Sequence, residues 1–105
     1  MHPFIESKLP EIKRLFEQYD IKSAYLFGSA GTERFGENSD VDFVIEFGDN
    51  VTDPAERGEN WWSLYYALRD LLRRDVDLLT MNSLSNPYLI EEINRTKRMI
   101  YAAAA

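Results

Sequence analysis

Two short patterns in the sequence carry groups that could bind phosphate and a metal ion. An apolar run ends at Gly28-Ser29, and Asp40 and Asp42 stand further along at the head of a second apolar run. Carboxylates two residues apart on a strand project from the same face, where they repel each other unless a cation lies between them. Mg²⁺ suits such a pair because it is a hard ion that binds carboxylate and phosphate oxygens together. The aspartates therefore predict a magnesium site that acts on a phosphorylated substrate.

The Gly28-Ser29 pair is typical of a phosphate-binding turn. Glycine lets the backbone approach a ligand closely, and Ser29 can cap a helix whose free N–H groups bind anions. Either pattern alone more often marks an ordinary turn or a solvated strand end, whereas their combination favours an active site. Ser39 and Arg34 complete the candidate nucleotide-binding residues, although Arg34 equally fits a solvated loop position.

These groups need strands that bring them together. The segments Ile21–Phe27 and Val41–Phe47 are rich in β-forming apolar residues, and a hairpin-like return between them would place the glycine turn beside the aspartates. Asp75–Thr80 predicts a third strand. If it lies beside Val41–Phe47, Asp75 or Asp77, which point to the same side of that strand, can supply a third carboxylate of the site. Three carboxylates around two metal ions suit phosphoryl chemistry.

Periodic apolar residues predict the remaining elements. Spacings of three and four residues indicate helices over Lys8–Tyr19, Asn60–Arg73 and Pro87–Lys97. Turn-forming residues predict exposed connections over Gly48–Gly58 and Asn82–Asn86, and Met99–Tyr101 predicts a short edge strand. The expected fold class is α/β (α+β), a small mixed β-sheet with helices packed on it. We expect one domain over residues 1–105, with its core at about 21–101 and a functionless alanine tail at 102–105.

The helix expected over Asn60–Arg73 carries a second candidate surface. Its core stripe leaves Trp62, Tyr66, Arg69 and Arg73 together on another side. Tryptophan, tyrosine and arginine are the residues enriched at interface hot spots. We expect this side to bind a partner protein; the alternative is that a later part of the same domain covers it.

Composition excludes several classes of protein. The net charge of −6 argues against direct nucleic-acid binding, and it fits a small nucleotide or a protein with a basic surface better. The absence of cysteine excludes disulfides and thiolate metal sites. No apolar run is long enough to cross a bilayer, so no membrane association is predicted and a cytoplasmic location is expected. The oligomeric state, a homo-oligomer included, stays open.

The motif Gly28-Ser29, followed by Ser39-Asp40-Val41-Asp42, resembles the signature of the DNA polymerase β-like nucleotidyltransferase superfamily. The small size and the segment Val76-Asp77-Leu78-Leu79 resemble its minimal nucleotidyltransferases, the MNT or MntA-like antitoxins. This resemblance implies the polymerase β-like fold, two Mg²⁺ ions and ATP as substrate. It also implies that Asp40, Asp42 and Asp77 are the catalytic metal ligands, and that the glycine and serine hold phosphate.

The resemblance further implies an acceptor for the nucleotide. AMP would be transferred from ATP to a hydroxyl, specifically to a tyrosine of a partner HEPN ribonuclease toxin, and this chain would be the antitoxin. Many family members carry arginines directly after the Gly-Ser, but here Ala30 to Glu33 hold no arginine. That difference motivates a second hypothesis, a binding module that neutralises its partner by contact through Trp62 and Tyr66. A third is the catalytic half of a small-molecule nucleotidyltransferase of the aminoglycoside type.

Overall fold

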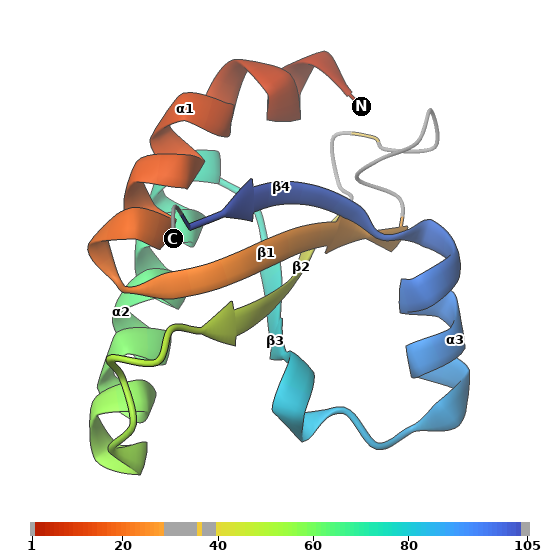
Figure 1. Ribbon diagram of the computed structural model, residues 1–105. Helices are drawn as coiled ribbons and strands as arrows, with labels where there is room; N and C mark the ends of the chain where they lie inside the picture. Colours follow the sequence, from red (N-terminus) through yellow and green to blue (C-terminus); the bar gives the residue numbers. More distant parts are fainter. Residues whose placement is uncertain (1, 29–35, 37–39, 104–105) are drawn as a thin grey trace.

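The computed structural model describes residues 2–28, 36 and 40–103 (Figure 1). Its elements follow the chain in the order α1 (Pro3–Gln18), β1 (Ile21–Phe27), β2 (Val41–Phe47), α2 (Pro54–Leu72), β3 (Val76–Thr80), the short 3₁₀ turn η2 (Met81–Ser83), α3 (Pro87–Thr96) and β4 (Arg98–Ala102). No helix of the described residues combines the length and apolar character that a membrane span requires.

The four strands form one mixed sheet in the order β3-β2-β1-β4. Strand β1 pairs antiparallel with both β2 and β4, and β2 pairs parallel with β3. The expected small mixed sheet with packed helices is therefore confirmed, as are the antiparallel return from β1 to β2 and the edge strand near the C-terminus. The three helices and the mixed sheet give the structure an α+β architecture.

Helices cover both faces of the sheet. The larger core lies under α1 and α2, where Phe43 of β2 meets Phe16 of α1 edge to face with ring centroids 5.9 Å apart. The smaller core lies under α3, where Ile93 packs with Phe27 and Val44. Because side chains alternate along a strand, the residues of β2 divide between the two cores. The α3 face is the one that also carries Asp42 and Asp77.

Helix α1 begins earlier than its periodicity indicates. The expected start at Lys8 is wrong, because Ile5 is fully buried and fixes an additional N-terminal turn against the core. His2 caps this turn by accepting a hydrogen bond from the Phe4 amide at 3.2 Å. Pro10 consequently lies inside the helix, and Pro3 occupies the first turn, where proline is tolerated.

Helix α2 also begins earlier than expected, at Pro54, so only the first part of Gly48–Gly58 is a connection. Asp53 caps the helix by accepting a hydrogen bond from the Ala55 amide at 3.0 Å. Val51 is fully buried, which contradicts a wholly exposed loop. An aspartate followed by a proline is a sound helix start because the first turn needs a side-chain acceptor and tolerates the missing N–H.

The C-terminal strand β4 includes the first of the four terminal alanines, Ala102. The amide of Ala103 then donates to the Lys22 carbonyl at 2.8 Å, next to the β1–β4 pairing. Tyr101 packs on the larger core, with its ring centroid 5.6 Å from that of Phe16. Ala102 and Ala103 are therefore part of the folded structure at the end of β4.

Candidate active site

Two aspartates meet on neighbouring strands at one end of the sheet. The parallel pairing of β2 with β3 sets Asp42 directly opposite Asp77. Val41, Phe43, Val76 and Leu78 belong to the core under α1 and α2, so the intervening aspartates lie on the α3 face. The expected placement of this third strand beside β2 is thus present. Asp40, which immediately precedes β2, is exposed.

Asp42 is the electrostatically perturbed group of this pair. Partial burial, followed by repulsion from Asp77, Asp40 and Glu92, raises the pKa of Asp42 from 3.8 to about 6. Both causes disfavour the charged carboxylate, so the arrangement opposes folding at neutral pH. A divalent cation would reverse this balance by neutralising the converging negative charges.

The oxygen donors at this site fit magnesium. Within residues 2–28, 36 and 40–103, no three side chains among His, Cys, Asp and Glu come close enough together to form a complete metal site. Mg²⁺ does not need such a cage, because it commonly uses one or two protein carboxylates together with waters and substrate phosphates. Asp42 and Asp77 could supply the protein carboxylates, and the exposed Asp40 lies near enough to repel Asp42.

The turn after β1 is shaped around Asp42. Gly28 has φ +68°, and a Cβ built on it would lie 2.8 Å from Oδ2 of Asp42. Phe27, the residue before it, pairs with Asp42 across β1 and β2. Any side chain at position 28 would therefore be strained and would displace the carboxylate. Glycine is needed here because it lets the turn approach Asp42.

Thr96, at the end of α3, holds this turn in place. Its Oγ1 accepts a hydrogen bond from the Gly28 amide at 3.1 Å and donates one to the Glu92 carbonyl at 2.8 Å. The Gly28 amide thus already has a hydrogen-bond acceptor within the protein. In the structure, Gly28 makes room for the Asp42 carboxylate. Sequence reasoning missed Thr96 and Glu92. A threonine that bonds back within its own helix is a local feature, but its contact with a glycine 68 residues away leaves no pattern in the sequence.

The other predicted site residues are distributed as follows. Ser29, Arg34 and Ser39 lie outside the described residues. Arg69 forms an ion pair with Asp75 at 3.7 Å. Arg73 ends α2 in the left-handed conformation, with φ 56°.

The exposed side of α2 carries a contiguous group of rings. Trp61 stacks on Tyr65 with centroids 5.2 Å apart, and Trp62 stacks on Tyr66 at 5.8 Å. Trp62 and Tyr66 are each 54% exposed. We call Trp61, Trp62, Tyr65 and Tyr66 the aromatic row. Within the described part of the chain, nothing covers the outer half of Trp62 and Tyr66.

The sequence has relatives with assigned names. Residues 10–104 match the family described as "Polymerase beta, Nucleotidyltransferase". "Putative protein adenylyltransferase MJ1217" of Methanocaldococcus jannaschii is 37% identical over 93 residues, which span 83% of this chain and 89% of that protein. MJ0126 of the same organism carries the same description and is 37% identical over 82 residues, 77% of this chain and 78% of that protein.

Solved structures share the fold. A toxin–antitoxin structure with AMP-PNP superposes with a TM-score of 0.71 at 25% identity, over 90% of this chain and 73% of that one. A tri-AMPylated Shewanella oneidensis HEPN toxin in complex with its MNT antitoxin matches with a TM-score of 0.60 at 23% identity, over 93% of this chain and 72% of the matched one, a likeness of fold alone. With residues 10–104 inside the family pattern, this chain belongs to the polymerase β nucleotidyltransferases and is a nucleotidyltransferase.

Proposed function

We propose that this nucleotidyltransferase moves AMP from ATP to a hydroxyl group of a partner protein. The observation that carries the proposal is the pairing of Asp42 with Asp77 beside the Gly28 turn. The relatives named as protein adenylyltransferases support a protein as acceptor. The net charge of −6 also suits an acceptor with a basic surface.

The reaction needs an acceptor hydroxyl placed against the α-phosphorus of ATP. The acceptor oxygen forms a new bond to phosphorus, the bond to the bridging oxygen of pyrophosphate breaks, and the hydroxyl proton leaves. Asp42 and Asp77 would hold Mg²⁺ together with the substrate phosphates. Asp40 stays a predicted third ligand, and two ions are expected from the family resemblance. Bound Mg²⁺ supplies charge neutralisation on the triphosphate and makes the acceptor hydroxyl easier to deprotonate.

The chain's own residues orient these groups. Asp77 is exposed on the edge strand β3, so one of its carboxylate oxygens is open to accept the hydroxyl proton from an incoming acceptor. Asp42 is half-buried between Phe27 and Asp77 and would be the fixed ligand of the pair. Ser29, Ser39 and Arg34 stay predicted phosphate-binding residues.

The partner we propose is a HEPN-type toxin, modified on a tyrosine, which would make this chain its antitoxin. The solved complex of an AMPylated HEPN toxin with an MNT antitoxin of the same fold supports this choice. The uncovered half of the aromatic row, with Arg69 and Arg73 on the same helix, is the surface we assign to that partner.

Labelled ATP tests the transfer. The protein is incubated with Mg²⁺ and an extract of its own cells, with ATP labelled in one sample at the α-phosphate and in another at the γ-phosphate. The proposal predicts a protein band labelled by the first and not by the second. It also predicts no band with the Asp42→Asn/Asp77→Asn variant. Labelling from the γ-phosphate would show a kinase activity. Labelling by the aspartate variant would show that Asp42 and Asp77 are not the active site.

The exposure of Trp62 and Tyr66 also favours the second hypothesis, neutralisation by contact alone. The two hypotheses differ in what the aspartates do. An Asp42→Asn/Asp77→Asn variant that still silences its partner at equal concentration would support contact. A variant that binds the partner without silencing it would support adenylylation.

A further inference from the structure

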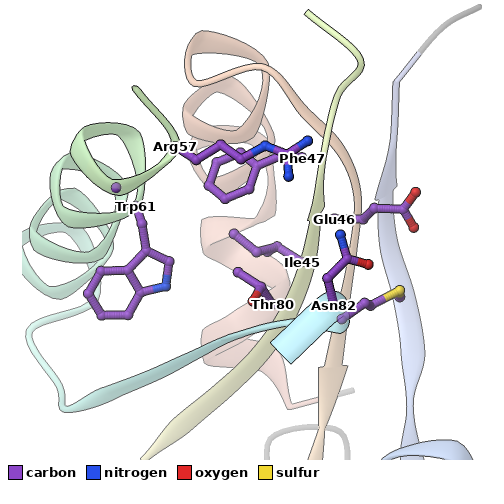
Figure 2. Close-up of a pocket in the computed structure, with 9 residues that line it drawn as sticks. Ile45, Glu46, Phe47, Arg57, Trp61, Thr80 and Asn82 are labelled. Atoms are coloured by element: carbon purple, nitrogen blue, oxygen red, sulfur yellow. The ribbon is translucent and has the colours of Figure 1, made fainter. Parts of the chain in front are cut away.

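A cleft of about 240 Å³ lies at the opposite end of β2 from Asp42, between the first half of α2 and the ends of β2 and β3 (Figure 2). Phe47 in its wall lies five strand positions beyond Asp42, a path of roughly 17 Å. The proposed reaction uses nothing in it. Its volume is below the roughly 300 Å³ at which small-molecule pockets begin, so it suits one inserted side chain better than a nucleotide.

The walls of the cleft are apolar and fixed. Ile45 and Phe47 project into it from β2, and Trp61 forms the α2 side (Figure 2). The indole N–H of Trp61 donates to the Leu78 carbonyl at 3.1 Å, which holds the ring in one orientation. A rigid apolar wall of this kind receives an anchor side chain without first having to reorganise.

A guanidinium stands at the rim. Arg57 donates through Nε to the Val51 carbonyl, and its guanidinium carbon lies 5.9 Å from the centre of the Phe47 ring. These two contacts orient the planar group, which then offers its terminal N–H donors to a carboxylate. The other charged residue of the lining, Glu46, is paired with Lys22 at 3.4 Å.

Gly58 opens the cleft to the outside. It lies in α2, one turn before Trp61 and Trp62, where glycine disfavours the helix relative to alanine. A Cβ at this position would meet no atom within 4 Å, so close packing does not require glycine here. What the missing side chain provides is empty space at the mouth of the cleft.

The cleft continues into the aromatic row. Trp61 belongs to both, and its ring meets that of Trp62 edge to face with centroids 4.8 Å apart. A protein that covers the exposed Trp62 and Tyr66 would therefore lie next to the Trp61 wall of the cleft.

We propose that this cleft seats one apolar side chain of the acceptor protein, with a carboxylate of the same segment on Arg57. The inference rests on the proposed function, because it assumes a protein acceptor. It adds the recognition element, an apolar anchor next to an acidic residue, and places it away from the aspartates. The volume, the rim cation and the continuity with the aromatic row select this occupant over a free nucleotide.

Short peptides test the cleft independently of any reaction. Amide and indole N–H resonances of the ¹⁵N-labelled protein are followed by NMR during titration with acetyl-Phe-Asp-amide. A second titration with acetyl-Phe-Asn-amide is the uncharged control. We expect shifts at Gly58, Trp61 and Asn82, and affinity for the acidic peptide about two- to fivefold higher, the size of an exposed ion pair. The Arg57→Gln variant should remove that difference.

Two substitutions at one position provide the control. Gly58→Leu should fill the mouth and abolish the shifts, whereas Gly58→Ala adds one methyl group in open space and should leave binding intact. Peptide shifts that persist in Gly58→Leu, or equal affinity for both peptides, would overturn the proposal. So would a homodimer in sedimentation that Gly58→Leu dissociates, because the occupant would then be a second copy of this chain.

The two proposals can fail separately. If the peptides bind as predicted but no protein accepts AMP, the cleft stands and the acceptor chemistry is wrong. If a protein is adenylylated equally fast by wild type and by Gly58→Leu, the reaction stands and the cleft does not serve the acceptor.

Discussion

The carboxylate of Asp42 occupies the space that a side chain at position 28 would need, since a Cβ on Gly28 would lie 2.8 Å from its Oδ2. Asp42 thereby joins the turn after β1 to the strand that we propose binds the metal ion. The glycine of the motif acts here by making room for an aspartate, in addition to any contact with phosphate. The proposed catalytic pair and the turn are a single packed unit, and substitution of Gly28 or Asp42 should disturb both.

Gly28→Ala should therefore remove most activity. The left-handed backbone costs an alanine about 1 kcal/mol or more, and the methyl group displaces Asp42 from its place opposite Asp77. We expect nucleotidyl transfer to fall by about a hundredfold, measured as initial rate with saturating ATP. Gly58→Ala is the matched control, since the same change in an open helical position should raise stability by about 0.5–1 kcal/mol. An active Gly28→Ala enzyme would contradict the packing described for the turn.

The stability of the metal-free protein should fall as pH rises from 4 to 7. The pKa of Asp42 is raised to about 6 in the folded state, chiefly by burial and then by neighbouring carboxylates. The folded state thus binds this proton more tightly than the unfolded chain does. The resulting stabilisation of the folded state is complete below pH 3.8 and is lost as the pH rises through about 6. Because Asp42 is only half-buried, we expect an effect of about 1 kcal/mol in urea denaturation.

Asp42→Asn should flatten that pH dependence, whereas Asp49→Asn, in an exposed turn, should not.

Mg²⁺ should raise the melting temperature of the wild type at pH 7.5 and less at pH 5, where the Asp42 proton competes with the ion. EDTA should reverse the gain. An equal magnesium shift in Asp42→Asn would place the ion elsewhere.

Thr96 should act as a positioning residue for the Gly28 turn. Thr96→Val keeps the shape of the side chain but leaves the Gly28 amide without its acceptor, at a cost of about 1–2 kcal/mol. We expect kcat to fall by about tenfold with a smaller change in the KM for ATP, because Asp42 loses its fixed neighbour. Thr96→Ser retains the hydroxyl and should restore kcat. If valine and serine lower kcat equally, the methyl group matters and the hydrogen bond does not.

Trp62→Ala and Tyr66→Ala should weaken partner binding and leave the fold intact. Both side chains are 54% exposed, so their loss should change the melting temperature little. If they anchor the acceptor, each substitution should cost about 2 kcal/mol of affinity in calorimetry, or roughly thirtyfold in Kd. Tyr88→Ala, an 83% exposed aromatic residue on α3, is the control. Unchanged affinity in the double variant would move the interface away from α2.

The strands were the most predictable part of the fold. Strands β1 and β2 have the predicted bounds because each is a short apolar run that a glycine follows. The pairing of Asp42 with Asp77 could be anticipated because Asp77 stands in a third apolar run of the same kind. Alternation then fixed the face on which both carboxylates lie.

What the sequence could not reveal depends on long-range packing. The early starts of α1 and α2 depend on the burial of Ile5 and Val51, single apolar residues in polar surroundings that produce no periodic signal. The bond between Gly28 and Thr96 joins residues that only the folded sheet brings together. The cleft beside Gly58 is a property of space between elements, and a mid-helix glycine alone does not predict it.

The intact mass of the acceptor tests the central claim most directly. The partner is purified separately from cells that lack this protein, and it is mixed with ATP, Mg²⁺ and either the wild type or Asp42→Asn/Asp77→Asn. We predict that the wild type adds the mass of one or more AMP groups to the partner and that the aspartate variant adds none. A partner that is silenced by the wild type while its mass stays unchanged would contradict the account and leave contact alone as the mechanism.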